Sequence, residues 1–174
     1  PVLSLMIIWE ALLFYYAAKA KRVALLGNLI VAGVCASAFA IGAMATGGYV
    51  GVLFPAGVAF VLVLSRELIK GAEDVDGDLS VGAETLAIRF GGERVALWSA
   101  LLLSLCAVVL PLPGLLCVSG RLYTVHVLLL VVPGLLGAAY LILKYPVKPM
   151  FNRASWILKF DMLAGIVVLG LGRV

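Results

Sequence analysis

Acidic residues are concentrated in one short stretch of this sequence. Glu73, Asp74, Asp76 and Asp78 lie within six positions, although charged residues make up only 13% of the chain and hydrophobic residues 64%. Carboxylates this close together repel one another, and a bound cation relieves that repulsion. The stretch is therefore a candidate metal site, and the basic residues just before it suggest an anionic ligand.

A calcium loop is the first alternative, because Asp74, Asp76 and Asp78 have the one-three-five spacing of an EF-hand. That loop also needs glycine at its sixth position and glutamate at its twelfth. Those positions hold Leu79 and Thr85, so we reject this interpretation.

A solvated polar loop without chemistry is the second alternative, since most charge runs are of that kind. Against it, Arg66, Lys70, Asp74 and Asp78 follow one another at intervals of four residues. If the helix continues through them, they form a ladder of opposite charges along one side.

A magnesium and diphosphate site is the third interpretation. Magnesium prefers a few carboxylates together with water and phosphate oxygens, and Asp74 and Asp78, one helical turn apart, can point at a common ion. Lys70 and Arg66 can hold the remaining phosphate charge, and Lys21 in an earlier polar segment adds to it.

The rest of the chain must hold these groups at a membrane. Its mean hydropathy is +1.20, and apolar runs long enough to span a bilayer recur along it. Open sheets do not survive in lipid and no barrel-like alternation is present, so the runs predict an all-α, polytopic helix bundle in a single transmembrane domain, residues 1–174. The six predicted helices are 1–18, 28–46, 50–70, 95–118, 122–143 and 155–172.

The basic residues predict the orientation of these helices. Eleven of the 13 Lys and Arg residues fall in or beside three alternate connections, 19–27, 71–94 and 144–154, and only Arg121 and Arg173 fall on the other side. The positive-inside rule places the three connections, and with them the candidate site, on the cytoplasmic side of the cell membrane. The net charge of +4 thus reflects topology, and we expect no nucleic-acid partner.

Three segments of the sequence together resemble a known family. The first is RELIK (66–70) with EDVDGD (73–78), followed by Gly82, Thr85 and Gly91. The second runs from Tyr16 through Lys21 to Gly27 and Asn28, and the third is NRAS (152–155). The first resembles the second aspartate-rich motif of the UbiA-type intramembrane prenyltransferases. The others are similar to the family's tyrosine–lysine–glycine–asparagine segment and to the link before its last helix.

The resemblance implies a fold of nine transmembrane helices around a central cavity, of which these would be the last six. It implies magnesium-dependent transfer of a geranylgeranyl group from geranylgeranyl diphosphate to the lipid acceptor geranylgeranylglyceryl phosphate, because the first segment is most similar to the archaeal ether-lipid branch. An aromatic or quinone-precursor acceptor, and a non-catalytic transporter or scaffold, are the alternatives. Expected roles are catalysis and metal binding for Asp74 and Asp78, diphosphate binding for Lys21, Arg66 and Lys70, and support for Tyr16, Asn28 and Glu73.

One part of the family pattern is missing. The family's first acidic motif, Asn-Asp-x-x-Asp-x-x-x-Asp, is absent, because aspartates occur only at positions 74, 76, 78 and 161. We therefore expect the sequence to be the C-terminal two-thirds of a longer protein, inactive by itself. Asp161 is a lone acid in an apolar helix, and pairing with Lys159 or with another loop cation is left open.

Overall fold

The computed structural model describes residues 2–18, 23, 25–46, 51–116 and 118–171, and most of these residues are helical. Helices are expected here because a helix satisfies its own backbone hydrogen bonds, which lipid cannot do. The described residues contain no strand, only an isolated bridge between Val23 and Glu84. The longer helices are α1 (Val2–Ala18), α2 (Leu26–Thr46), α3 (Leu53–Glu73), α6 (Gly92–Val109), α9 (Val132–Lys144) and α10 (Lys148–Leu171); the shorter ones are α4 (Val75–Ser80), α5 (Leu86–Phe90), α7 (Leu112–Leu115), α8 (Arg121–His126) and the π-helical turn η2 (Val127–Val131).

Two predicted boundaries are wrong. The last helix begins at Lys148, not at residue 155, because hydropathy detects the lipid-facing part of a helix and misses a polar first turn. In that first turn the backbone N–H groups of Met150 and Phe151 donate to the carbonyl of Val147 at 2.9 and 3.1 Å. The predicted helix 95–118 is interrupted after Val109, and Pro111 caps the start of the short α7, because proline cannot donate to the preceding turn.

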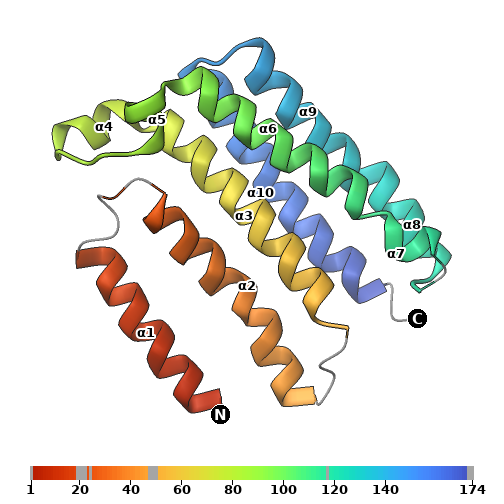
Figure 1. Cartoon of the computed structure of the whole chain (residues 1–174). Coiled ribbons are helices and arrows are strands. Elements are labelled where there is room, and N and C mark those ends of the chain that lie inside the picture. The colour runs from red at the N-terminus through yellow and green to blue at the C-terminus, as the bar shows by residue number, and fades with distance from the viewer. Residues whose placement is uncertain (1, 19–22, 24, 47–50, 117, 172–174) are drawn as a thin grey trace.

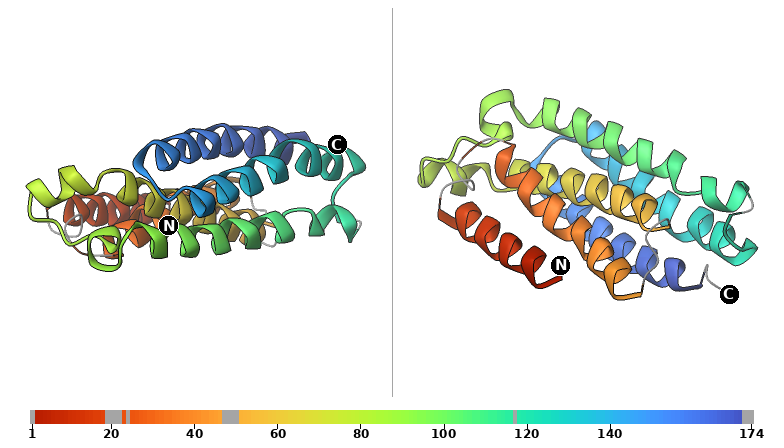
Figure 2. Two further views of the ribbon diagram at one scale, coloured as in Figure 1. Left: turned by 90° about the horizontal axis from the view of Figure 1, so that it is seen from above. Right: turned by 60° about the horizontal axis from the view of Figure 1, so that its bottom comes forward.

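Helices α3, α6, α9 and α10 form the core of the bundle. Helix α3 packs on α2, α6 and α10, and α9 packs on α6 and α10, whereas α1 packs on α2 at one side (Figure 1). The right-hand view of Figure 2 also shows α1 at the edge of the bundle. The largest fully buried side chains of the bundle are Ile69, Leu103, Tyr123, Leu135, Ile142, Phe151 and Leu158.

The connection after α3 and the connection before α10 lie at the same end of the bundle. Lys148 at the start of α10 pairs with Asp76 of α4 at 3.1 Å, and Asn152 donates to Glu73 at 2.6 Å. Figure 1 shows α4 and α5 at this end, beside the start of α2. Segments 70 or more residues apart in the sequence are thus held together around the acidic stretch.

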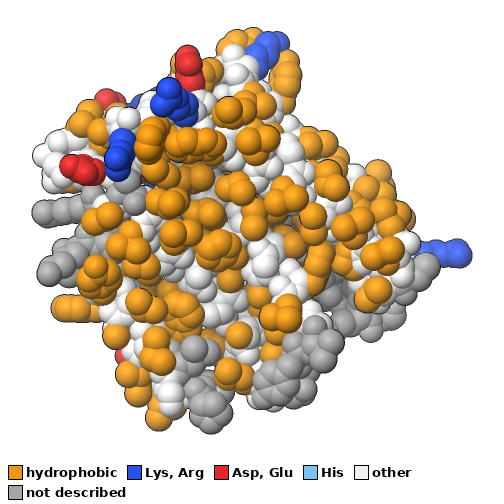
Figure 3. Space-filling model, in the orientation of Figure 1, with side chains coloured by type: hydrophobic (Ala, Val, Ile, Leu, Met, Phe, Trp, Pro, Cys, Tyr) orange, Lys and Arg blue, Asp and Glu red, His pale blue; other side chains and the backbone are white. Residues whose placement is uncertain are grey.

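The outer surface of the bundle is apolar. In Figure 3 hydrophobic side chains cover most of the visible face, and charged side chains gather mainly near the end that carries α4 and α5. Large apolar side chains that are exposed on the outer faces include Leu101, Leu105, Val108, Leu129, Leu136, Phe160, Leu163, Ile166 and Val167. Such a surface suits contact with lipid and would be a liability in water.

Three helical segments of the described residues are long and apolar enough to cross a membrane: Leu26–Ala45, Gly92–Leu115 and Arg121–Lys144. The prediction of six spans is therefore met in part. Helix α1 has 17 residues, and α3 carries Arg66, Glu67 and Lys70 near its end. The basic residues Lys19, Lys21, Arg22 and Arg173, on which the orientation partly depends, lie outside the described residues.

Candidate active site

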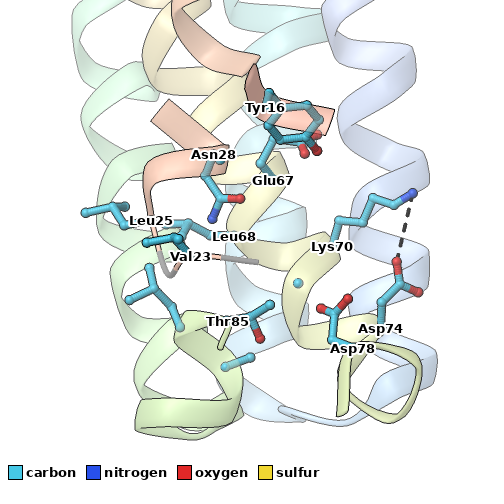
Figure 4. A pocket seen from close by; sticks show the side chains of 14 residues that line it. Tyr16, Val23, Leu25, Asn28, Glu67, Leu68, Lys70, Asp74, Asp78 and Thr85 are labelled. Carbon is cyan, nitrogen blue, oxygen red and sulfur yellow. Dashed lines mark ion pairs between the residues drawn. The ribbon is translucent and has the colours of Figure 1, made fainter. Parts of the chain in front are cut away.

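A polar cavity of about 110 Å³ lies where α1, α2, α3 and the α4–α5 connection meet (Figure 4). Helices α1 to α5 and the segment before α2 all contribute to it, so no single element could form it. The lining residues are Tyr16, Val23, Leu25, Gly27, Asn28, Glu67, Leu68, Lys70, Gly71, Asp74, Asp78, Thr85, Leu86 and Ala87.

The last turns of α3 supply one charged wall of the cavity. Glu67, Lys70, Gly71 and Asp74 all line it, and their spacing of three or four residues places them on one face of a helix. Lys70 and Asp74 form an i, i+4 ion pair at 3.9 Å, with about half of each side chain exposed. This pair is therefore solvent-screened and adds little to stability, which leaves both groups available to a ligand.

Helix α3 ends at Glu73, and the chain bends at Asp74, whose φ and ψ are −97° and 14°. At this bend the N–H of Asp74 donates to the carbonyl of Lys70 and the N–H of Asp78 donates to that of Asp74, both at 3.0 Å. These two bonds belong to the last turn of α3 and the first turn of α4, which meet at Asp74, and both aspartates line the cavity. Figure 4 shows the two carboxylates on neighbouring turns.

Asp76 points away from the cavity, as the spacing of the aspartates predicts. Its carboxylate pairs with Lys148, and 83% of its side chain is exposed. A residue halfway between two others on a helical turn faces the opposite side. Asp76 thus contacts α10, whereas Asp74 and Asp78 face the cavity that α1 and α2 also line.

The α4–α5 connection supplies the far wall. Gly82 turns the chain in the left-handed region at φ +66°, and the N–H of Ala83 donates to the carbonyl of Asp78 at 2.9 Å. Thr85 then caps α5, accepting from the N–H of Ile88 at 3.4 Å. The bridge between Val23 and Glu84 ties this connection to the segment before α2.

Tyr16 of α1 and Asn28 of α2 line the cavity opposite α3. In Figure 4 the Tyr16 ring lies close to Glu67, and the Asn28 side chain extends toward α3. The sequence motif that joins these two residues therefore does meet the acidic stretch in space.

Arg66 and Glu73, which are also predicted site residues, do not line the cavity. Arg66 donates to Glu67 at 2.9 Å and does not line the cavity, so the predicted ladder of charges does not include it. Glu73 accepts from Asn152 and also faces α10. Lys21 lies outside the described residues.

Two polar residues of the lining, Glu67 and Thr85, have no role among those that the sequence predicts. The helical spacing of Glu67 from Lys70 and Asp74 is the signal that could have identified it. Thr85 could not have been identified in that way, because it reaches the cavity through the turn at Gly82.

The carboxylates fit magnesium as part of a shared site. The described residues hold no group of three or more His, Cys, Asp or Glu side chains arranged to bind a metal. Asp74 and Asp78 are nevertheless two carboxylates on one open cavity, and magnesium in phosphate sites is held by one or two carboxylates with substrate oxygens and waters.

Comparison with known proteins decides the family. The model of the UbiA prenyltransferase family matches residues 1–160. The chain belongs to the UbiA prenyltransferase family. The resemblance drawn from the three sequence segments is thus confirmed, and this member of the UbiA family is a membrane protein.

Several curated UbiA relatives are named digeranylgeranylglyceryl phosphate synthase. That of Thermococcus kodakarensis is 33% identical over 171 residues, covering 92% of this chain and 60% of the relative. That of Methanococcus aeolicus is 34% identical, covering 91% of this chain and 56% of the relative. A solved structure from work on digeranylgeranylglyceryl phosphate synthase in membranes has a TM-score of 0.88 and 26% identity, covering 98% of this chain and 61% of that one. The chain thus spans about 60% of the length of these UbiA proteins.

Proposed function

We propose that this chain is part of a magnesium-dependent enzyme that transfers a geranylgeranyl group from geranylgeranyl diphosphate to geranylgeranylglyceryl phosphate. The observation that carries the proposal is the cavity itself, which brings Asp74, Asp78 and Lys70 together with Tyr16 and Asn28. Membership of the prenyltransferase family and the names of the relatives support the reaction and its substrates.

Asp74 and Asp78 would hold magnesium in this mechanism, and the ion would neutralise charge on the departing diphosphate. Lys70 orients the diphosphate by a direct charge contact. The allylic carbon–oxygen bond breaks and its electron pair leaves with the diphosphate. The acceptor hydroxyl oxygen then bonds to the allylic carbon and loses its proton, which forms an ether. The buried apolar side chain of Leu68 in the cavity wall would help to keep water from the cation, which water would otherwise capture.

Supporting roles are assigned by position. We propose that Tyr16 and Asn28 close the cavity over the diphosphate from α1 and α2, and that Glu73 holds the bend against α10 through Asn152. The proposed phosphate contact of Lys21 rests on the sequence motif. For Arg66, the bond to Glu67 supports an indirect role, in which the arginine orients a glutamate that lines the cavity.

We further propose six membrane spans, the last six of nine, with the cavity facing the cytoplasm. The three basic connections support this orientation, and the clustering of charge at the α4–α5 end agrees with it. The expectation that these 174 residues are inactive alone stays a prediction, because they contribute one aspartate pair to the site.

Transfer of label tests the proposed function. Membranes that contain the complete protein, labelled geranylgeranyl diphosphate, geranylgeranylglyceryl phosphate and magnesium should yield a labelled glyceryl ether lipid. Label found on an added aromatic acid instead, with none on the glyceryl lipid, would reject the proposed acceptor and favour the quinone-precursor alternative. Loss of product on chelation and its return on adding magnesium would test the metal.

A further inference from the structure

A second cavity, of about 210 Å³, lies between α2, α3, η2 and α10, nearer the opposite end of α3 from the polar cavity. Its walls are almost wholly hydrocarbon and include Phe39, Phe54, Val58, Leu62, Val131 and Met162. An apolar cavity of about 150 Å³ already takes a ligand the size of benzene. This cavity is thus large enough for a segment of hydrocarbon chain.

Asp161 of α10 lines this apolar cavity. Only 7% of the residue is exposed, and its Oδ2 is buried without a hydrogen-bond partner. The pairing with Lys159 that the sequence left open does not form, because the Lys159 ammonium lies 3.9 Å from the centre of the Trp156 ring. A buried carboxyl group without a partner is costly, and ionisable groups inside a membrane protein often mark a ligand path.

The other polar groups of the lining do not supply the missing partner. The Tyr123 hydroxyl donates to the carbonyl of Leu110 at 2.8 Å, and the Cys35 thiol is a weak partner. The described residues contain three more buried side-chain atoms without a partner, on Trp9, Arg66 and Ser99, and none of these residues lines the cavity.

The fold makes room for the Asp161 carboxyl group. It lies against Gly134 of α9, where any Cβ would overlap the carboxyl oxygens. The adjoining η2 turn is π-helical, and its Val127 and Val131 line the cavity. Such π-helical turns are rare and are often found at functional sites.

We propose that this cavity binds a long-chain alcohol, whose hydrocarbon body lies against the apolar walls and whose hydroxyl group bonds to Asp161. A hydroxyl group can donate to an ionised carboxylate or accept from a protonated one, so it satisfies Asp161 in either state. A plain hydrocarbon would leave the carboxyl group unpaired. A cationic chain would bury two charges among apolar walls, which costs more than it returns in most settings.

Photolabelling in proteoliposomes of the complete protein tests the proposal. The two probes are a dodecanol that carries a diazirine and the same diazirine chain without the hydroxyl group. The alcohol should label residues 54–63 and 161–169 about fivefold more than the hydrocarbon does, the factor expected for one net hydrogen bond. Equal labelling would overturn the proposal and assign the cavity to hydrocarbon chains alone.

Variants and competitors sharpen the test. Asp161→Leu should remove the excess labelling, whereas Asp161→Asn, which still donates and accepts, should keep it. Ser99→Ala removes a buried unpaired atom away from the cavity and should have no effect.

In the wild-type protein, unlabelled dodecanol should compete with the labelling and dodecane should not, which keeps the test valid if Asp161→Leu fails to fold. Excess labelling that survives in folded Asp161→Leu, or equal competition by dodecane, would reject the proposal. None of these readouts requires turnover, so they are independent of the proposed function.

Discussion

At the scale of single residues, three aspartates within five positions have different surroundings. Asp74 and Asp78 line the polar cavity, whereas Asp76 pairs with Lys148. The same side chain thus has two environments, because the helical turn directs alternate positions to opposite sides. Replacing each aspartate by asparagine, which has almost the same volume, tests whether the charge matters in each of the two environments.

In the complete protein, we expect Asp74→Asn and Asp78→Asn to lower turnover by about 100-fold to 1000-fold, the usual effect of removing one preorganised charge contact in an active site. Asp76→Asn is the matched control and should stay within a few-fold of wild type. The melting temperature of Asp74→Asn should change little, because the Lys70–Asp74 pair is half exposed. Turnover at saturating magnesium and a thermal melt measure both effects. If Asp76→Asn lost activity while Asp74→Asn and Asp78→Asn stayed active, the assignment of Asp74 and Asp78 to the active site would be wrong.

The bond from Asn152 to Glu73, 2.6 Å long, should couple α10 to the end of α3. In a double-mutant cycle with Glu73→Ala and Asn152→Ala, we expect a coupling free energy of about 0.5–1.5 kcal/mol in unfolding, typical of one hydrogen bond. The exposed neighbour Arg153 serves as the control partner, and Arg153→Ala should show no coupling to Glu73→Ala. Additive effects in the first cycle would mean that the bond contributes nothing.

At the scale of elements, the α4–α5 connection depends on one backbone conformation. Gly82 has φ +66°, with no atom close to the position of an added Cβ. Glycine is therefore required at this position because of the backbone conformation, and not because neighbouring atoms would crowd a side chain.

Gly82→Ala should destabilise the protein by about 1–2 kcal/mol, the cost of a left-handed residue with a side chain. Gly77→Ala is the control, since Gly77 lies inside α4 with free space around it and no left-handed backbone. That change should be neutral or stabilise by up to about 1 kcal/mol. Chemical unfolding in detergent gives both values. Equal effects of the two alanines would show that the backbone at Gly82 is not strained by a side chain.

At the scale of the whole molecule, the proposed topology places residues 80 and 147 on one side of the membrane and residue 120 on the other. In a background without the native cysteines, Ser80→Cys and Val147→Cys should react with an impermeant thiol reagent only from the cytoplasmic side. Gly120→Cys should react only from outside. Labelling of intact vesicles and of inverted vesicles distinguishes the two sides of the membrane. Labelling of Ser80→Cys and Gly120→Cys from the same side would contradict the six-span topology.

The helical class, the family and the residues of the acidic stretch all follow from the sequence. Lipid allows few backbone solutions, so apolar runs specify helices. The spacing of Asp74 and Asp78 specifies a shared side, because helical geometry is local. The start of the last helix was missed, because its first turn at Lys148 is polar.

Which distant groups meet depends on how the helices pack in the tertiary structure. Asp76 contacts Lys148 across 72 positions and Glu73 contacts Asn152 across 79. The same folding brings Tyr16, Asn28 and Thr85 to one cavity, and leaves Asp161 alone in another. Local patterns carry no information about such pairs, because their distances depend on how whole helices pack and on turns such as the one at Gly82.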